Sequence, residues 1–182
     1  MRIIMGIDPG LANTGFGVVR AAGSRMTAID GGTIEAPPGE PAEQRLKTIH
    51  AALTELIEWH SPESVALESL YFGKNVRSAM AVGQARGVVM LAAAARGLAC
   101  FDYTPQSVKL AVCGTGTAGK DQVKHMVGVL LNLPVEPPSD HAADALAVAV
   151  CHASHLQGSP TLTPTITATA AASADTERVA LQ

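Results

Sequence analysis

The stretch RIIMGIDPG, residues 2–10, decides what kind of fold this chain can form. Its apolar run predicts a strand that is buried on both faces, and Pro9 and Gly10 end that strand. Two further strands are predicted at residues 15–20 and 26–35, and glycine-rich turns separate the three. Consecutive strands with short connections indicate an antiparallel meander at the start of the chain.

Helical and strand patterns alternate after this meander. Residues 41–60 place apolar side chains three and four positions apart, which is typical of a helix that packs on a sheet. The same reasoning gives the remaining elements in this order: strand 64–68, helix 75–96, strand 98–103 and helices 106–112, 120–131 and 139–156. The sequence therefore predicts an α/β fold in which helices cover a sheet.

The composition of the 182 residues limits the class of protein. With 47% hydrophobic and 16% charged residues, the chain can bury one core, but it lacks the length of a two-lobed kinase or a barrel enzyme. No apolar stretch reaches the roughly 18 to 20 residues of a membrane span, and no export signal is visible. We expect a cytoplasmic protein with one domain at residues 1–156 and a mobile, low-complexity tail at 157–182.

Charge is distributed unevenly along the chain. The formal net charge of −3 would by itself argue against binding to nucleic acid. Residues 74–124, however, carry seven Lys and Arg side chains against two Asp, a local charge of +5. This pattern favours a basic face for a polyanion, with scattered solubilising charge as the alternative interpretation.

Acidic side chains stand where two predicted strands end. Asp8 closes the first strand, and Glu68 closes the strand at 64–68. A carboxylate beside a buried strand must be paired, hydrogen-bonded or metal-bound to offset its desolvation cost. The carboxyl ends of such strands also face the ligand crevice of an open sheet. A functional site is therefore predicted here, although Asp8 could instead serve as a turn former before Pro9.

The segment PPSDHAADALAVAV, residues 137–150, supplies further candidates. Ser139 can cap a helix, and helical spacing puts Asp144 on the same face as Asp140 and close to His141. Oxygen and nitrogen ligands from three elements would bind hard cations such as Mg²⁺ or Mn²⁺. Two such ions can stabilise the attacking and leaving oxygens of a phosphodiester. As an alternative to metal binding, Asp140 could interact favourably with the N-terminus of its own helix.

These motifs resemble, in order, the RuvC Holliday junction resolvases of the RNase H-like superfamily. The likeness spans residues 1–156 and rests on five blocks: GIDPG with the following TGFGVV, ALES around Glu68, FGKN at 72–75, GQARG at 83–87 and HAADALA at 141–147. The resemblance implies a mixed five-stranded sheet of three antiparallel and then parallel strands. It also implies a homodimeric endonuclease of recombination and DNA repair, which makes paired symmetric nicks with metal-activated water and works with RuvA and RuvB.

The resemblance assigns roles to single positions. Matched to the family, Asp8, Glu68 and Asp144 fall on the catalytic, metal-binding carboxylates, and His141 falls on the remaining ligand. Many members have Asp at this fourth position. Two cations per site are expected, and because imidazole is a softer ligand, His141 should favour Mn²⁺ over Mg²⁺. Asp140 stays open as the alternative fourth ligand.

DNA and dimer contacts are also implied by the resemblance. Lys109, Lys120 and the aromatic Tyr71 match family positions that contact DNA. The basic middle of the chain adds Lys74, Arg77 and Lys124 as further expected DNA-binding residues. The expected dimer surface is the helix at 75–96, where Gly83 and Gly87 would let a second backbone approach. Solvated surface lysines and a helix packed only in its own core are the alternatives.

Other classes of protein fit parts of the sequence. GTGTAGKD at 114–121 has P-loop spacing, but Asp121 stands where Ser or Thr would hold Mg²⁺. GIDPG followed by TGFG also resembles the phosphate loop of actin-like kinases, which need two domains. A non-catalytic scaffold that binds DNA junctions is the third alternative, and the three retained carboxylates argue against it.

Overall fold

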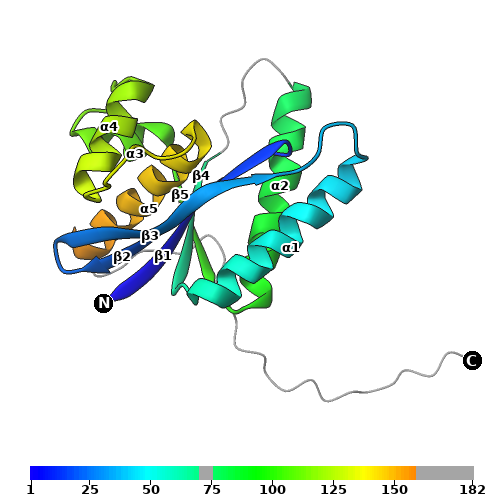
Figure 1. Ribbon diagram of the computed structural model, residues 1–182, viewed down its shortest axis with the longest axis horizontal. Helices are drawn as coiled ribbons and strands as arrows, with labels where there is room; N and C mark the ends of the chain where they lie inside the picture. The colour runs from blue at the N-terminus through cyan, green and yellow to red at the C-terminus, as the bar shows by residue number, and fades with distance from the viewer. Residues whose placement is uncertain (70–75, 159–182) are drawn as a thin grey trace, which may run out of the picture.

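The computed structural model describes residues 1–69 and 76–158 (Figure 1). The elements are β1 Arg2–Asp8, β2 Asn13–Ala22, β3 Arg25–Glu35, α1 Ala42–His60, β4 Ser64–Glu68, α2 Val76–Ala95, β5 Ala99–Tyr103, α3 Pro105–Cys113, α4 Lys120–Leu130 and α5 Asp140–Gly158. Every expected helix and strand is present, and small differences concern only their ends.

The strands form one mixed sheet in the order β3-β2-β1-β4-β5. β2 pairs antiparallel with both β1 and β3, whereas β4 runs parallel to both β1 and β5. The predicted sheet of three antiparallel strands followed by parallel strands is therefore confirmed. In the central pair Ile7 lies beside Leu67, so the next residues, Asp8 and Glu68, end neighbouring strands at the same edge of the sheet.

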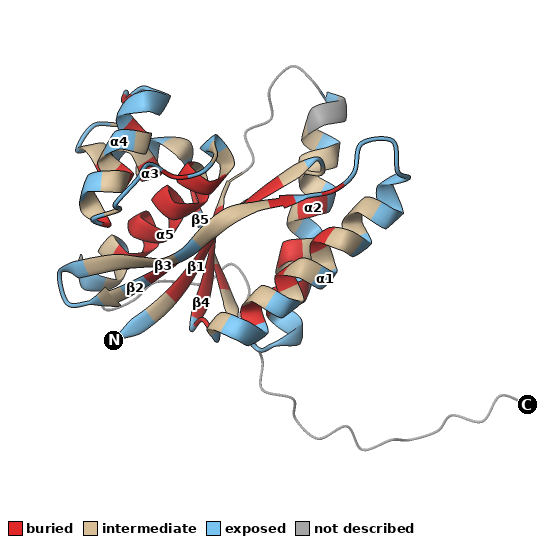
Figure 2. Cartoon of the chain, in the orientation of Figure 1, coloured by how far each residue is buried: buried red, intermediate tan, exposed pale blue. Residues whose placement is uncertain are grey.

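Helices cover both faces of this sheet (Figure 1). One core joins the sheet to α1 and α2 and contains Met5 and Leu67, while the other joins it to α3, α4 and α5 and contains Ile4 and Ala66. Figure 2 shows the buried residues gathered on the strands and on the helix faces that contact them. Because side chains alternate along a strand, Asp8 and Glu68 belong to the face that α5 covers.

Glycines on the sheet allow α5 to lie very close to it. A Cβ atom on Gly6 would lie 2.1 Å from the carbonyl oxygen of Ala145, and one on Gly15 would lie 2.0 Å from the carbonyl oxygen of His141. A side chain at either position would push the helix away. The missing side chains thus place the first turns of α5 directly beside the ends of β1 and β2.

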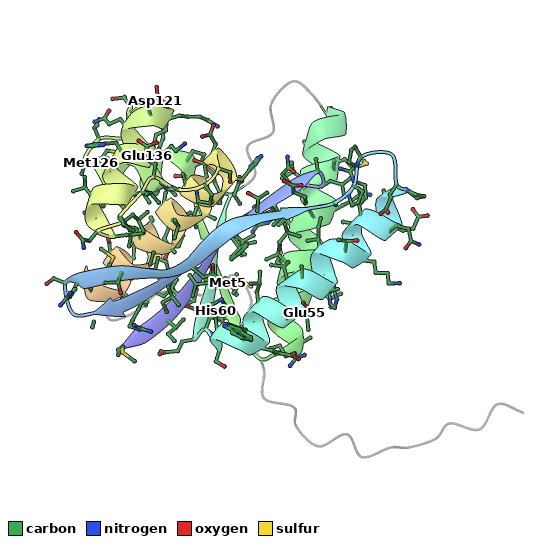
Figure 3. All side chains as sticks on the ribbon, viewed as in Figure 1. Met5, Glu55, His60, Asp121, Met126 and Glu136 are labelled. Atoms are coloured by element: carbon green, nitrogen blue, oxygen red, sulfur yellow. The ribbon has the colours of Figure 1, made fainter. Side chains whose placement is uncertain are left out.

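The opposite layer is fixed to the sheet by its own polar contacts. His60, at the end of α1, places Nε2 2.9 Å from Oδ2 of Asp30 on β3. Figure 3 shows His60 beside the sheet and Glu55 further along the same helix. In the part of the chain that the structure describes, no helix combines the length and apolar character needed to cross a membrane.

The end of α5 bears on the expected domain boundary. The helix continues to Gly158, past the boundary expected at residue 156. Residues 159–182, which make up most of the expected tail, lie outside the described residues. The division into a domain and a tail therefore stays a prediction.

Candidate active site

Three elements bring the four predicted ligands to one edge of the sheet. Asp8 ends β1 and Glu68 ends β4, whereas His141 and Asp144 lie in the first turns of α5. Nδ1 of His141 lies 2.9 Å from Oδ2 of Asp8. Glu68 is close enough to Asp8 and Asp144 for both charges to raise its pKa. The side chains that the sequence separates by as many as 136 positions are thus neighbours in space.

The start of α5 is held in place by Ser139. Its Oγ accepts a hydrogen bond of 3.0 Å from the backbone N–H of Ala142, which confirms the predicted helix cap. The same hydroxyl lies 2.6 Å from Oγ1 of Thr33 on β3. The contact between Ser139 and Thr33 thus connects the helix that carries His141 and Asp144 to the sheet. Thr33 was not among the predicted site residues, because no local sequence pattern marks a contact between such distant positions.

The carboxylates of the site repel one another. Burial is the main reason that the pKa of Glu68 is raised to about 7, and repulsion from Asp8 and Asp144 adds to the shift. The positive charges of Lys120 and Lys109 lower the same pKa by smaller amounts. The pKa of Asp144 is also raised, first by burial and then by Asp8. A bound cation would relieve this repulsion, so the electrostatics of the donor set fit a metal site.

The side chains do not yet form a coordination shell. Within residues 1–69 and 76–158, no group of three or more His, Cys, Asp or Glu side chains stands close enough to hold a metal ion. Oδ2 of Asp8 instead contacts His141, and Oδ2 of Asp144 lies 3.8 Å from Nζ of Lys120. Metal binding would require these contacts to be exchanged for coordination bonds. Asp8 and Glu68 start from a favourable arrangement, because they end neighbouring strands, which lie only about 4.8 Å apart in a sheet.

Asp140 and His141, the two candidates for the fourth ligand, have different surroundings. His141 contacts Asp8, whereas the side chain of Asp140 is 69% exposed and its Oδ1 lies 3.5 Å from Nζ of Lys124. Lys124 also lies 3.9 Å from Glu136. The geometry therefore favours His141, and it leaves Lys124 engaged with acidic neighbours.

The structure describes only some of the predicted DNA-binding side chains. The positive charges of Lys109 and Lys120 both lower the pKa of Glu68, so both lysines lie near the acidic cluster. Lys120 is exposed and begins α4 directly after Gly119. Tyr71 and Lys74, as well as the side chain of Arg77, lie outside the described residues.

The P-loop interpretation of residues 114–121 fails on topology. A P-loop connects a strand to a helix, but this segment connects α3 to α4. Asp121 remains at the position of the required hydroxyl residue and lies in the first turn of α4 (Figure 3). The glycine-rich segment is thus a helix start and not a nucleotide site.

The outer side of α2 combines apolar side chains with glycine. Val76, Met80 and Leu91 are exposed large apolar residues, and Gly87 is exposed with open space where a Cβ would stand. Gly83 follows in the same stripe, because these positions are spaced three and four apart. Ala85, Val89 and Ala92 form the buried side of the helix. Gly87 is therefore not required for packing within this chain.

Comparison with known proteins gives one family. A family model described as crossover junction endodeoxyribonuclease RuvC matches residues 4–152. A curated relative of that description from Pelotomaculum thermopropionicum is 52% identical over 153 residues, covering 84% of this chain and 93% of the relative. Another, from Moorella thermoacetica, is 53% identical over 152 residues, covering 84% and 91%.

Solved structures agree with this finding. The structure of Thermus thermophilus RuvC matches with a TM-score of 0.80 and 37% identity, covering 86% of this chain and 96% of that chain. T. thermophilus RuvC in complex with Holliday junction substrate matches with a TM-score of 0.83 and 36% identity, covering 87% and 96%. The family model alone spans residues 4–152, which include all four predicted metal ligands.

Proposed function

Because the chain belongs to the RuvC family of crossover junction endodeoxyribonucleases, we propose that it resolves Holliday junctions by hydrolysing phosphodiester bonds in DNA. The observation that carries the proposal is the convergence of Asp8, Glu68 and Asp144 at one sheet edge, where burial and the charge of Asp8 raise the pKa values of Glu68 and Asp144. The symmetric pair of nicks leaves ends that a ligase can seal, which places the enzyme in recombination and DNA repair. We place this activity in the cytoplasm, where bacterial DNA lies.

Divalent cations are the cofactors that this donor set suits. Asp8, Glu68, His141 and Asp144 would hold two ions, Mg²⁺ or Mn²⁺, as three carboxylates and one imidazole. When bound, such ions activate water and stabilise the charge that develops on the phosphate. The imidazole of His141 must be neutral to bind metal. If Nδ1 is the ligand atom, its contact with Asp8 would be replaced when the ion enters. Its softness favours Mn²⁺ relative to an all-carboxylate site.

Cationic side chains beside the cluster would hold the DNA backbone. Lys120 is exposed at the start of α4, where the first backbone N–H groups of the helix have no partner within the helix. Lys109 lies close enough to Glu68 to lower the pKa of that carboxyl group. A helix N-terminus with a lysine is a suitable phosphate site. Tyr71, Lys74 and Arg77 remain proposed contacts from the sequence. Lys124 is assigned a weaker role because it pairs with Asp140.

A twofold dimer would present two such sites to the two strands that are cut. The proposed surface for this contact is the stripe on α2 that contains the exposed residues Val76, Met80, Gly87 and Leu91 and the half-buried Gly83. Leu91→Glu should give a monomer by sedimentation at micromolar concentration, because it places a charge in an apolar interface. Val129→Glu, at a similarly exposed position of α4, should stay dimeric. RuvA and RuvB are the protein partners that we propose from family resemblance.

A cleavage assay tests the proposed function. A labelled four-way junction and a linear duplex are incubated with Mg²⁺, Mn²⁺ or chelator. The wild type should nick the junction symmetrically and only with metal, whereas Asp8→Asn should bind the junction without nicking it. Glu55→Gln, on the opposite layer (Figure 3), is the control and should nick normally. Equal cleavage of the linear duplex would indicate a general nuclease, and binding without any metal-dependent cleavage would indicate a scaffold.

A further inference from the structure

Arg86 joins helix α2 to the end of the strand that carries Glu68. Its Nη1 donates a hydrogen bond of 3.1 Å to the backbone carbonyl oxygen of Glu68. Its Nη2 donates to the carboxylate of Asp102 on β5. The side chain of Arg86 is only 13% exposed, so these contacts lie in a largely buried place. One guanidinium thus bridges a helix and two neighbouring strands.

The contact lies on the face of the sheet opposite to the Glu68 carboxylate. Asp102 is paired in register with Leu67, which belongs to the core under α1 and α2. Glu68, the next residue, directs its side chain to the other face, toward α5. Arg86 therefore touches the backbone of Glu68 and not its reactive oxygens.

The backbone of Glu68 needs such support because the sheet holds it incompletely. The pairing of β1 with β4 ends at Leu67, so Glu68 has no partner residue on β1. On the other side it is aligned with Tyr103, and the N–H of Ser69 donates to the Tyr103 carbonyl at 2.8 Å. The carbonyl of Glu68 accepts a hydrogen bond from the Arg86 side chain, which supports the backbone at this strand end. A strand end with fewer ladder bonds opens more easily than the strand interior.

We propose that Arg86 is a positioning residue for Glu68, which fixes the backbone at the end of β4 so that the carboxylate points into the cation site. This inference rests on the proposed role of Glu68 as a metal ligand. Arginine suits the task because its planar fork serves the carbonyl and the Asp102 carboxylate at once, whereas lysine is a point charge. Asp102 compensates the buried positive charge.

Arg86 lies on α2 directly beside the proposed dimer surface. The next residue, Gly87, is exposed on the stripe that we propose as the dimer surface. The same helical turn would therefore contact a second copy on its outer side and hold the active-site strand on its inner side.

The test compares Arg86→Gln and Arg86→Lys with Arg96→Gln in the full-length protein. Arg96 is a matched control because it also forms an ion pair, with Glu58 on α1, but it follows the far end of α2 and does not contact β4. Four quantities are measured: Mn²⁺ affinity without DNA by electron paramagnetic resonance, junction affinity in chelator, the single-turnover nicking rate on saturating junction, and the melting temperature.

Arg86→Gln should lose about 10- to 100-fold in both Mn²⁺ affinity and nicking rate, as is usual when a residue that supports a ligand is removed. Junction affinity in chelator should change by less than about twofold, because Arg86 does not contact the DNA side of the site. Arg86→Lys keeps a charge for Asp102 and should keep most of the melting temperature, yet it should recover Mn²⁺ affinity only in part. Arg96→Gln should bind Mn²⁺ like the wild type.

Wild-type Mn²⁺ affinity and nicking in folded Arg86→Lys and Arg86→Gln would overturn the proposal, and so would a loss in Arg96→Gln equal to theirs. If Arg86→Gln does not fold, Arg86→Lys decides the question by the same two measurements. Glu68→Gln in the same series separates this inference from the proposed function. If the wild type fails to nick, or Glu68→Gln nicks normally, the proposed site is wrong. If Glu68→Gln is inactive and the Arg86 variants are normal, only the positioning role is wrong.

Discussion

His141 is the residue at which this site departs from an all-carboxylate ligand set. Its ring contacts Asp8, so replacing it changes the donor chemistry beside that carboxylate. We expect His141→Asp to lower the ratio of the nicking rate in Mn²⁺ to that in Mg²⁺, because a harder oxygen ligand suits Mg²⁺ better. A change of about tenfold would correspond to about 1.4 kcal/mol in relative metal preference.

The control for this prediction is the neighbouring acid. Asp140→Asn should leave the metal preference unchanged, because Asp140 is exposed and pairs with Lys124. Loss of cleavage in Asp140→Asn with normal behaviour of His141→Asp would instead make Asp140 the fourth ligand.

A second histidine, His152, predicts how stability depends on pH. It is fully buried, with Nε2 3.0 Å from Oγ of Ser64 and Nδ1 2.6 Å from the hydroxyl of Tyr103. Burial is the main cause that lowers its pKa from 6.5 to about 4, and His155 and Arg2 add to it. The unfolded state therefore binds this proton first as the pH falls below 6.5. The contribution of His152 to the free energy of unfolding should fall by about 2 kcal/mol between pH 7 and pH 5.

The measurement is a comparison of urea unfolding for the wild type and His152→Gln at pH 7, 6 and 5. A comparison is needed because Glu68, whose pKa is raised to about 7, acts in the opposite direction over the same range. His152→Gln is expected to be less stable at pH 7, and the difference from the wild type should shrink as the pH falls. A difference that is constant with pH would contradict the prediction.

The sequence predicted the acidic residues of the site but not their supports. Asp8 and Glu68 could be recognised because each follows an apolar strand, and the helical spacing of Asp144 is local. The contacts of Thr33 with Ser139 and of Arg86 with Glu68 join positions that become neighbours only after the sheet and helices pack. Neither contact has a sequence pattern of its own.

At the scale of elements, the close approach of α5 to the sheet determines the site. We expect Gly15→Ala to destabilise the protein by about 1 to 3 kcal/mol or more, because its Cβ would overlap the His141 carbonyl in a packed core. The displaced helix should also reduce Mn²⁺-dependent nicking. Urea unfolding and the cleavage assay, both at pH 7, check this result. An unchanged nicking rate in a folded Gly15→Ala variant would show that the position of α5 is not critical.

Gly128→Ala is the matched control for that substitution. Gly128 lies within α4, and a Cβ there would meet nothing within 4 Å. Alanine should stabilise the helix by about 0.5 to 1 kcal/mol, since glycine costs more backbone entropy on folding. The two glycines therefore predict opposite signs of the stability change.

Periodicity in the sequence was sufficient to predict the elements themselves. Alternating and three-to-four spacings report which side of most strands and helices is apolar, and the structure buries those sides. Helix α2 is the exception, because it also exposes apolar side chains such as Met80 and Leu91. The distance between α5 and the sheet could not be predicted in this way. It depends on Gly6 and Gly15 facing the backbone of one particular helix, whereas in the sequence both are only small residues of predicted strands.

At the scale of the whole molecule, an acidic protein is proposed to bind a polyanion. The net charge is −3, yet residues 74–124 carry a local charge of +5. Lys109 and Lys120 from this segment flank the acidic cluster, so positive charge lies next to the proposed cleavage site. Bound cations would further reduce the negative charge there. The position of the positive side chains beside the cleavage site, and not the net charge of the protein, should therefore govern DNA affinity.

This placement predicts the salt dependence of junction binding. If about four to six phosphates are neutralised at each site, the logarithm of the affinity should fall with the logarithm of salt concentration with a slope of about −4 to −5. Lys120→Gln should reduce the magnitude of that slope by about 1, because one phosphate contact is lost. Lys47→Gln, exposed on α1 in the opposite layer, should leave it unchanged. Affinity is measured in chelator between 50 and 300 mM salt, so that cleavage does not interfere. A nearly flat dependence would mean that binding does not rely on phosphate contacts, and equal effects of both variants would mean that net charge matters more than its position.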